Sequence, residues 1–330
     1  MKSKGDSMLK KIINAVTLSS AMALTVGTAN AQEGDYPNRT IEMIMPYQAG
    51  GATETFARLI LDDMAEILGQ SIVMLHKPGA AGTIGARNGA EAKPDGYTLL
   101  ANTSGHVMYE GLFKDLPFDP VDDYSAVGVF GFAPIILVTS AKSDITSFEE
   151  LVKQAKNRTI SFASGAQGSL PHLTGERVAM LGDLDMMHIA FNGNAPALTS
   201  VMGGHVDTFY STAASVIPQI KSGDLRALAV STKERMPELP DVPTVAELLD
   251  APEFDVTAWY ALWAPKDTPA EIVEQLNGAM RQASETPGAL KRFAEYSVQP
   301  STLTAKEFGE FARQEREVWL EVMEQVDLEQ

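Results

Sequence analysis

The sequence predicts an α/β fold in which mainly parallel sheets are flanked by helices. Short apolar runs alternate along the chain with longer segments whose apolar residues recur at helical spacing. Glycine-rich turns follow two of these runs and lead into helical segments, which is the arrangement of repeated βαβ units. Apolar residues make up 45% of the 330 residues and charged residues 21%, as in ordinary globular domains.

The elements follow one another in a regular order. The first half predicts strands at residues 40–45, 71–75 and 97–101, with helices at 53–68 and 84–92. After an irregular stretch, further strands are expected at residues 135–139, 160–163, 186–191, 206–210 and 225–231. Trp259, Tyr260 and Trp263 belong to a later strand, and helices are expected at 269–285, 287–296 and 305–326.

Four helix starts carry a capping-box pattern, in which Ser or Thr is followed three residues later by Glu. They begin at Ser147, Thr244, Thr268 and Thr304. Between residues 131 and 255, Gly and Pro residues interrupt short strands, so we expect the chain to leave one lobe and return to it. The expected segments are a leader at 1–31, the first part of lobe 1 at 32–131, lobe 2 at 132–254, and the second part of lobe 1 at 255–330.

Composition excludes several classes of site and partner. The chain has no Cys, which excludes disulfides, thiolate zinc sites, iron–sulfur clusters and cysteine nucleophiles. Its 26 Lys and Arg against 43 Asp and Glu argue against a nucleic-acid partner, because phosphate binding needs clustered basic residues. The five His residues show no helical metal-ligand spacing, so we expect neither a metal nor a cofactor.

The first 31 residues have the pattern of a secretory signal peptide. Basic residues precede an apolar stretch at 12–26, which ends at the small-residue site Ala29-Asn30-Ala31. We expect cleavage after Ala31 and export to the periplasm. Translation could begin at Met1 or at Met8, and an amphipathic first helix of the fold is the alternative interpretation.

Two glycine-rich loops are the candidate binding elements. Residues 46–53 lie between a predicted strand and a helix, and residues 161–169 run from the predicted strand at 160–163 through a loop into a helix. At such helix starts, backbone N–H groups can hold a carboxylate without a basic residue. A plain strand-to-helix turn is the alternative for each. Signatures of a nucleophile elbow, a phosphate-binding loop, a dinucleotide site and a metalloprotease are missing from the sequence, so we expect no enzyme.

Eight motifs in order carry a family resemblance. They are Tyr36-Pro37-x-x-x-Ile41, Pro46-Tyr47-x-x-Gly50-Gly51-x-Thr53, Lys77-Pro78-Gly79-Ala80-x-Gly82, Pro94-Asp95-Gly96-Tyr97-Thr98-Leu99, Ser164-x-x-x-Gly168-Ser169-x-x-His172, Gly204-x-Val206-Asp207, Pro240-Asp241-Val242-Pro243-Thr244 and Ala264-Pro265-x-x-Thr268-Pro269. Together they make the chain after residue 31 resemble the Bug family, the periplasmic receptors of tripartite tricarboxylate transporters. The resemblance implies a two-lobed periplasmic binding-protein fold (type II-like), a small organic acid in a cleft between the lobes, and delivery to a membrane permease.

The resemblance also implies the ligand-binding residues. One carboxylate cradle would contain Tyr47, Gly51, Ala52 and Thr53, and the other Ser164, Gln167, Gly168 and Ser169. Ser104 and His106 follow the third strand, where a cleft contact is expected. Asp207 is expected near the cleft, with a structural cap as its alternative role. His172 and His188 are expected to be buried, hydrogen-bonded histidines.

Two departures from the family pattern bear on specificity. Glu54 stands where the family usually has Asp, and Phe191-Asn192-Gly193 stands where it often has Tyr-Lys-Gly. Asn192 is therefore a candidate specificity residue, or simply a turn residue before Gly193.

The resulting hypothesis is a monomeric solute receptor that delivers a small carboxylate to a permease. An aliphatic acid, an amino acid and an aromatic acid all stay open as ligands. The alternatives are a receptor that presents its ligand to a membrane sensor kinase, or an exported α/β hydrolase.

Overall fold

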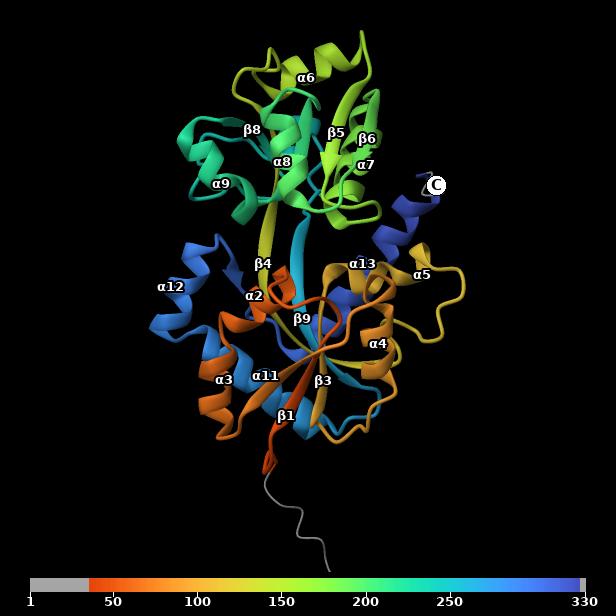
Figure 1. Cartoon of the computed structure of the whole chain (residues 1–330), viewed down its shortest axis with the longest axis vertical. Coiled ribbons are helices and arrows are strands. Elements are labelled where there is room, and N and C mark those ends of the chain that lie inside the picture. The colour runs from red at the N-terminus through yellow and green to blue at the C-terminus, as the bar shows by residue number, and fades with distance from the viewer. Residues whose placement is uncertain (1–35, 327–330) are drawn as a thin grey trace, which may run out of the picture. The chain divides into compact units, whose positions relative to one another are not determined.

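The computed structural model describes residues 36–326, and the chain from Arg39 onward forms one compact unit. The expected leader at 1–31 lies outside the described residues. Two mixed sheets share one long strand and are covered by helices (Figure 1). Within residues 36–326, no helix is long and apolar enough to cross a membrane.

Ten strands make up the sheets. They are β1 (Ile41–Met45), β2 (Ile72–His76), β3 (Thr98–Thr103), β4 (Tyr124–Ser140), β5 (Ile160–Ser164), β6 (Met186–Ala190), β7 (Thr208–Thr212), β8 (Leu225–Val230), β9 (Thr257–Pro265) and β10 (Gln299–Pro300).

The helices lie between and after these strands. They are α2 (Ala52–Arg58), α3 (Leu61–Leu68), η1 (Ala80–Gly82), α4 (Thr83–Ala90), η2 (Ser104–Met108), α5 (Tyr109–Leu112), α6 (Phe148–Ala155), α7 (Leu170–Gly182), α8 (Asn194–Met202), α9 (Ala213–Ser222), α10 (Val245–Leu249), α11 (Ala270–Ser284), α12 (Pro287–Glu295) and α13 (Ala305–Glu324).

Sheet A contains β2, β1, β3, β9 and the first part of β4, with β10 beside β4. In it β1 pairs parallel with β2 and β3, whereas β9 pairs antiparallel with β3 and β4. Sheet B contains the last part of β4 with β8, β7, β5 and β6. There β5 pairs parallel with β6 and β7, and β4 pairs antiparallel with β7 and β8.

The strand registers establish which edges of the two sheets face each other. In sheet A, Thr103 at the carboxyl end of β3 pairs with Tyr260, toward the end of β9 where β4 crosses into sheet B. The carboxyl ends of β3 and of its parallel neighbours β1 and β2 therefore point toward sheet B. In sheet B, Thr212 at the carboxyl end of β7 pairs with Ile135, the first residue of β4 in that sheet. The carboxyl ends of β5, β6 and β7 therefore point toward sheet A.

Apolar side chains hold the helices on the sheets. Helices α8 and α9 cover one face of sheet B, where Phe209, Ile136 and Val201 are fully buried in one cluster. On sheet A, α13 packs against β4, and its Phe308 contacts Trp259 and Trp263. Burial of such large side chains stabilises each half by about 1.5–3 kcal/mol per residue.

The predicted fold class is confirmed, and the sheets are more mixed than expected. The antiparallel pairs all involve β9 or the 17-residue β4, which is the strand that runs from sheet A into sheet B. The sequence pattern predicts a strand only at residues 135–139 of β4, because Gly128, Gly131 and Pro134 weaken the strand pattern before them. In the structure the residues before Pro134 pair with β9, and register shifts lie near both glycines.

Two predicted helix boundaries were wrong. The expected helix at 53–68 is divided into α2 and α3, because Leu59 and Ile60 make tighter i→i+3 bonds and the Leu59 carbonyl accepts a bond from Arg292 Nε. The side chains of Ser147, Thr244 and Thr304 cap helices as predicted, and of these three starts Thr304 alone has the full capping box, in which the Glu307 carboxylate accepts from the Thr304 N–H. Thr268 does not, since its hydroxyl donates to the Pro265 carbonyl and Pro269 takes the cap position.

Candidate functional site

Loops from both sheets gather where the carboxyl ends of the parallel strands face each other. On sheet A these are residues 46–53 after β1, the turn at 77–82 after β2, and η2 after β3. On sheet B they are residues 164–169 at the end of β5, 191–193 after β6, and the Thr212 junction after β7. We call residues 46–53 the sheet A loop and residues 164–169 the sheet B loop.

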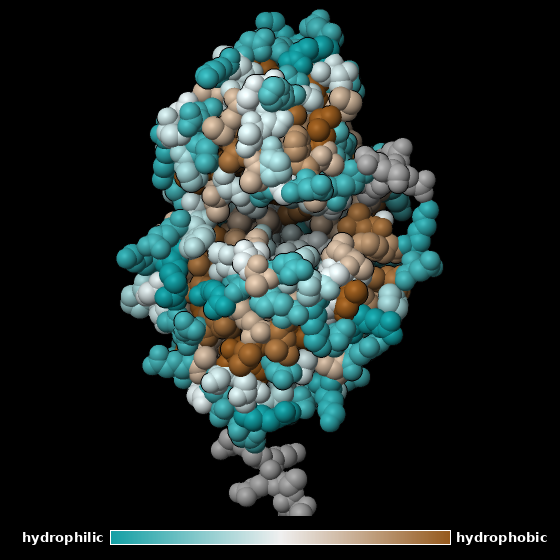
Figure 2. Space-filling view, in the orientation of Figure 1, coloured by the Kyte–Doolittle hydropathy of each residue, from teal (hydrophilic) through white to brown (hydrophobic). Residues whose placement is uncertain are grey.

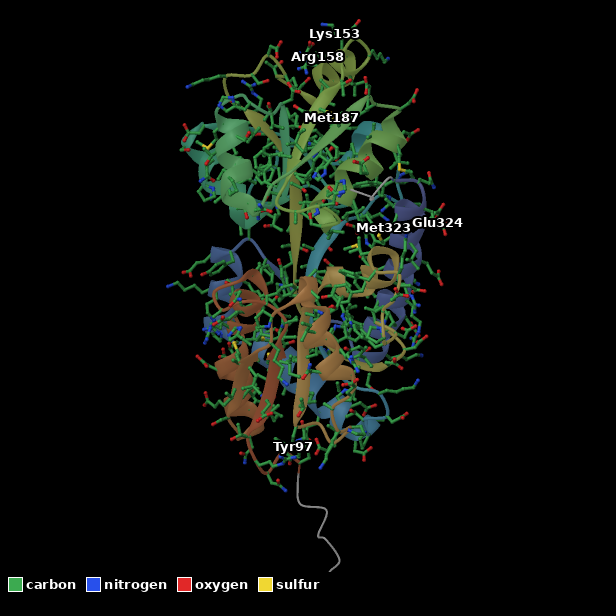
Figure 3. All side chains as sticks on the ribbon, turned by 45° about the vertical axis from the view of Figure 1, so that its right-hand side comes forward. Tyr97, Lys153, Arg158, Met187, Met323 and Glu324 are labelled. Atoms are coloured by element: carbon green, nitrogen blue, oxygen red, sulfur yellow. The ribbon has the colours of Figure 1, made fainter. Side chains whose placement is uncertain are left out.

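The figures agree with this arrangement. Tyr97, just before β3, and Arg158, just before β5, lie at opposite ends of the described chain in Figure 3, so the carboxyl ends of these strands face the middle. The space-filling surface is hollowed in the same middle region (Figure 2). Ligand sites in α/β proteins commonly lie outside the carboxyl ends of parallel strands.

Glu54 closes the sheet A loop. Its Oε2 accepts a 2.8 Å bond from the Gly50 N–H, and Gly50 has the positive φ of +82° that glycine adopts readily. The same carboxylate pairs with Arg58 and lies 3.4 Å from His76 Nε2. The hydrogen bond from Gly50, together with Arg58, lowers the pKa of Glu54 below its ordinary value. Glu54, which stands where the family usually has Asp, therefore stabilises the conformation of the sheet A loop.

The sheet A loop keeps several donors unused. The N–H groups of Gly51, Ala52 and Thr53 have no hydrogen-bond partner among residues 36–326, as expected at the start of a helix. The Thr53 hydroxyl also has no partner there, although the residue is only 3% exposed. Four donors thus lie within three consecutive residues, and the loop contains no basic side chain.

Tyr47 lies in a hydroxyl network beside this loop. Its hydroxyl is 3.4 Å from that of Tyr109, which donates to the Ala81 carbonyl and accepts a bond from Asn102 Nδ2. Gly82 (φ +97°) fits against both rings, since a Cβ there would lie 3.1 Å from Tyr47 Cε1 and in contact with the Tyr109 hydroxyl. Burial raises the pKa of Tyr109 well above its ordinary value, so the hydroxyl stays protonated. The sequence offered no signal for Tyr109, which lies 62 residues from Tyr47.

The hydroxyls of the sheet B loop bind the loop itself. The Ala166 carbonyl accepts bonds from Ser164 Oγ (2.9 Å) and Ser169 Oγ (2.7 Å). Ser169 also caps α7 by accepting from the His172 N–H. The family-based expectation gave these two hydroxyls to the ligand, and in this structure both are used within the loop.

The donors that the sheet B loop leaves unused are backbone groups. The N–H groups of Gly165 and Ala166 have no partner among the described residues, and Ala166 is exposed. The Gly168 N–H is used, because it donates to His172 Nδ1 at 2.9 Å. The Gln167 side chain lies on the same loop and is half-buried.

Asn192 lies directly beside the sheet B loop. The N–H of Phe191 donates to the Ser164 carbonyl (3.2 Å), and that of Gly193 donates to the Gly165 carbonyl (2.7 Å). These two bonds flank Asn192, which is exposed. Asn194 follows it and donates to Ser215 Oγ at 3.2 Å, which brings the start of α9 to the same edge. Sequence reasoning missed Asn194 and Ser215, although Asn194 is only two residues from Asn192.

One contact joins the two halves at this place. Gly168 of the sheet B loop has a φ of +66°, and a Cβ there would lie 2.8 Å from Cδ2 of Leu112 in α5. The sheet B loop therefore packs against the sheet A half. A cavity of about 380 Å³ lies next to this helix and is lined by residues from Glu110 to Pro120, outside both loops.

The expectation that Asp207 lies near a cleft is wrong. Asp207 precedes β7, at the amino ends of the sheet B strands, and its carboxylate accepts bonds from both Nη atoms of Arg158 at 2.8–2.9 Å. Arg158 lies at the outer end of the sheet B half (Figure 3). Ser161 adds a backbone and a hydroxyl bond to the same oxygen. Asp207 therefore ties strand ends together, which was its alternative role.

Ser104 and His106 are both buried at the start of η2, where the cleft contact of Ser104 stays a prediction and that of His106 does not fit. Ser104 is 3% exposed, and His106 is fully buried beside Tyr109, Tyr124 and Trp263. Burial lowers the pKa of His106 to about 3, so its ring is neutral at ordinary pH. His106 belongs to the aromatic core below the sheet A loop rather than to an exposed surface.

The site suits anion binding by neutral groups. Unused backbone N–H groups lie on both facing loops, and neither loop contains Lys or Arg. Residues 36–326 hold no group of three or more His, Asp or Glu arranged for a metal ion. Ser164 Oγ lies 2.7 Å from His188 Nε2, which is nucleophile–base geometry, but Ser164 is 0% exposed and His188 stacks on His172.

Comparisons with known proteins agree with these features. A family model described as "Tripartite tricarboxylate transporter family receptor" matches residues 56–328. Protein BugT of Bordetella pertussis is 34% identical over 304 residues, which cover 91% of this chain and 93% of BugT.

Solved structures with bound acids are also similar. One is MatC from Rhodopseudomonas palustris with bound malate, with a TM-score of 0.73 and 29% identity over 87% of this chain and 100% of that one. Another is Rpa4515 of R. palustris with adipate, with a TM-score of 0.76 and 28% identity over 88% of this chain and 98% of that one.

Proposed function

This chain belongs to the tripartite tricarboxylate transporter receptor family, and from that premise we propose that it is a periplasmic receptor for a small dicarboxylate. The ligand binds between the sheet A loop and the sheet B loop, and the loaded receptor delivers it to a membrane permease. The observation that carries the proposal is that unused N–H groups lie on both loops, at strand ends that face each other.

A dicarboxylate fits the distribution of donors. The N–H groups of Gly51, Ala52 and Thr53 and the Thr53 hydroxyl would hold one carboxylate. The N–H groups of Gly165 and Ala166 would hold the other, with Asn192 and Gln167 beside them. Malate and adipate, named with two of the similar structures, are both dicarboxylates. Neutral donors also leave the anion free of tight ion pairs, which favours release to a partner.

The lobe boundaries are part of the same proposal. The proposed division assigns residues 32–131 and 255–330 to a lobe around sheet A, which the structure describes for residues 36–131 and 255–326, and residues 132–254 to a lobe around sheet B. Support comes from β4, whose pairing changes from β9 to β7 between Pro134 and Ile135, and from β9, which begins at Thr257. Closure of the lobes over the ligand would present the bound form to the permease.

Ligand-dependent stabilisation tests the proposal. The chain without residues 1–31 is refolded to remove carried-over ligand, and its thermal unfolding is followed with malate, adipate, acetate and aspartate. A ligand at 100 times its Kd adds about 2.7 kcal/mol to the free energy of unfolding, which is a shift of a few degrees. Saturable stabilisation by a dicarboxylate but not by acetate supports the proposal. No response to any acid, with calorimetry in agreement, would overturn it.

A further inference from the structure

We propose that His172 and His188 are positioning residues for the ligand. They hold the sheet B loop in the shape that presents the N–H groups of Gly165 and Ala166 to a carboxylate. This inference rests on the proposed function and assigns the residues that maintain one side of its site.

His172 holds the loop through its backbone. The residue is 2% exposed, and Nδ1 accepts the 2.9 Å bond from the Gly168 N–H. Since Nδ1 accepts, the ring proton of the neutral form lies on Nε2, which faces Glu176 Oε1 at 3.3 Å. Glu176 therefore stabilises the tautomer that leaves Nδ1 available to Gly168.

His188 holds the loop through Ser164. Its Nε2 lies 2.7 Å from Ser164 Oγ, and that hydroxyl lies 2.9 Å from the Ala166 carbonyl. When His188 Nε2 carries the proton, it donates to Ser164, and the hydroxyl proton goes to the Ala166 carbonyl. This bond turns the Ala166 carbonyl toward Ser164 and thereby orients the peptide groups next to it.

The two rings act as one support. Their centroids are 3.6 Å apart with an interplanar angle of 19°, and the Phe162 ring lies beside both. His172 lies on α7 and His188 on β6. Because the rings are stacked, a displacement of one ring would displace the other and change both hydrogen bonds to the loop. Burial and the neighbouring His172 lower the pKa of His188 to about 4, which keeps the His188 ring neutral near pH 7.

Matched substitutions separate the hydrogen bond from the packing. Asn places an oxygen where His has Nδ1, so His172→Asn keeps an acceptor for Gly168, whereas His172→Leu fills the space without one. His188→Gln and His188→Met form the equivalent pair at Nε2. His205→Met, at an exposed histidine outside this cluster, is the control. In a buried position, Leu and Met favour stability more than the amides do.

The experiment measures ligand affinity and loop exchange in each variant. Kd values for malate and adipate come from calorimetry, and amide hydrogen exchange is followed at Gly168. We expect His172→Leu and His188→Met to weaken the affinity about two- to tenfold, the size of one net hydrogen bond, while the amide variants and His205→Met stay close to wild type. Gly168 exchange should accelerate in His172→Leu and not in His172→Asn.

The possible outcomes are distinguishable. Affinity that follows stability, with the amide variants weaker than the apolar ones, would mean that the rings only pack, and would overturn the inference. Equal affinity in all variants would overturn it as well. If the wild-type protein binds no acid, the proposed function fails, and the positioning role for a ligand fails with it. The Gly168 exchange rates then still report separately whether His172 holds the loop.

Discussion

Gly168 of the sheet B loop and Leu112 of α5 are in direct contact, although 56 residues of sequence and a change of sheet separate them. A Cβ on Gly168 would lie 2.8 Å from Leu112 Cδ2, closer than non-bonded carbon atoms approach. The loop that would hold one carboxylate therefore depends on the opposite half for its position.

Gly168→Ala should weaken dicarboxylate binding and lower stability. The substitution forces an alanine into a φ of +66° and pushes against Leu112, and such strain costs about 1–3 kcal/mol. Gly223→Ala is the matched control, because Gly223 also has a positive φ (+80°) but nothing within 4 Å of an added Cβ. Calorimetry should find reduced affinity only for Gly168→Ala, whereas chemical denaturation should find both variants destabilised. Equal affinities would disprove a role for the contact.

Thr53→Val should reduce ligand affinity with little effect on folding. Valine keeps the shape of threonine, and the Thr53 hydroxyl has no partner among the described residues that would be lost. A ligand carboxylate left without this donor loses about 1–3 kcal/mol of binding free energy, roughly five- to 150-fold in Kd. Thr199→Val, on the surface of α8, serves as the control. An unchanged Kd in Thr53→Val would show that this hydroxyl does not bind the ligand.

Asp207→Asn should destabilise the protein without changing ligand affinity. Burial raises the pKa of Asp207, but the bonds from Arg158 and Ser161 outweigh it and hold the pKa below its ordinary value. The ionised form is therefore favoured by folding, and its contribution is present above the unfolded pKa of about 3.9 and is lost as pH falls further. We expect a loss of about 1–3 kcal/mol at pH 7, since the side chain is only 25% exposed.

The same variant distinguishes a stability role from a binding role. Denaturant unfolding at pH 7 and at pH 3 should find a large difference from wild type at the first pH and a smaller one at the second. Calorimetry at pH 7 should give wild-type Kd values for any dicarboxylate that binds. A larger Kd in Asp207→Asn would show that Asp207 contributes to ligand binding.

Acid should destabilise the fold through His106. Burial lowers the pKa of His106 to about 3, below the unfolded value of about 6.5. Between these values the unfolded state binds the additional proton, so stability falls as the pH is lowered from about 6.5 to 3, by up to about 1.4 kcal/mol per pH unit. His106→Asn keeps an acceptor for Asn102 Nδ2 and should have a shallower pH dependence across this interval. Identical pH profiles for the two proteins would contradict the assignment.

Much of the local structure could be predicted from local patterns. The strand at residues 160–163 and the cap residues Ser147, Thr244 and Thr304 depend on neighbours within a few positions, and the structure confirms them. The break between α2 and α3 could not be predicted, because Arg292, which holds the Leu59 carbonyl, is 233 residues away.

The same distinction applies to the candidate site. The order of strands, turns and helices is encoded locally, and so are the two glycine-rich loops, the family motifs and the lack of basic residues in those loops. Which donors stay unused was decided only by the tertiary structure. It commits Ser164 and Ser169 to the Ala166 carbonyl, brings Tyr109 to Tyr47, and places Asp207 at the outer end of its sheet. The reason is that a hydroxyl can donate only one hydrogen bond and a carboxylate can accept only a few. Long-range packing determines which partner lies within about 3 Å of each group.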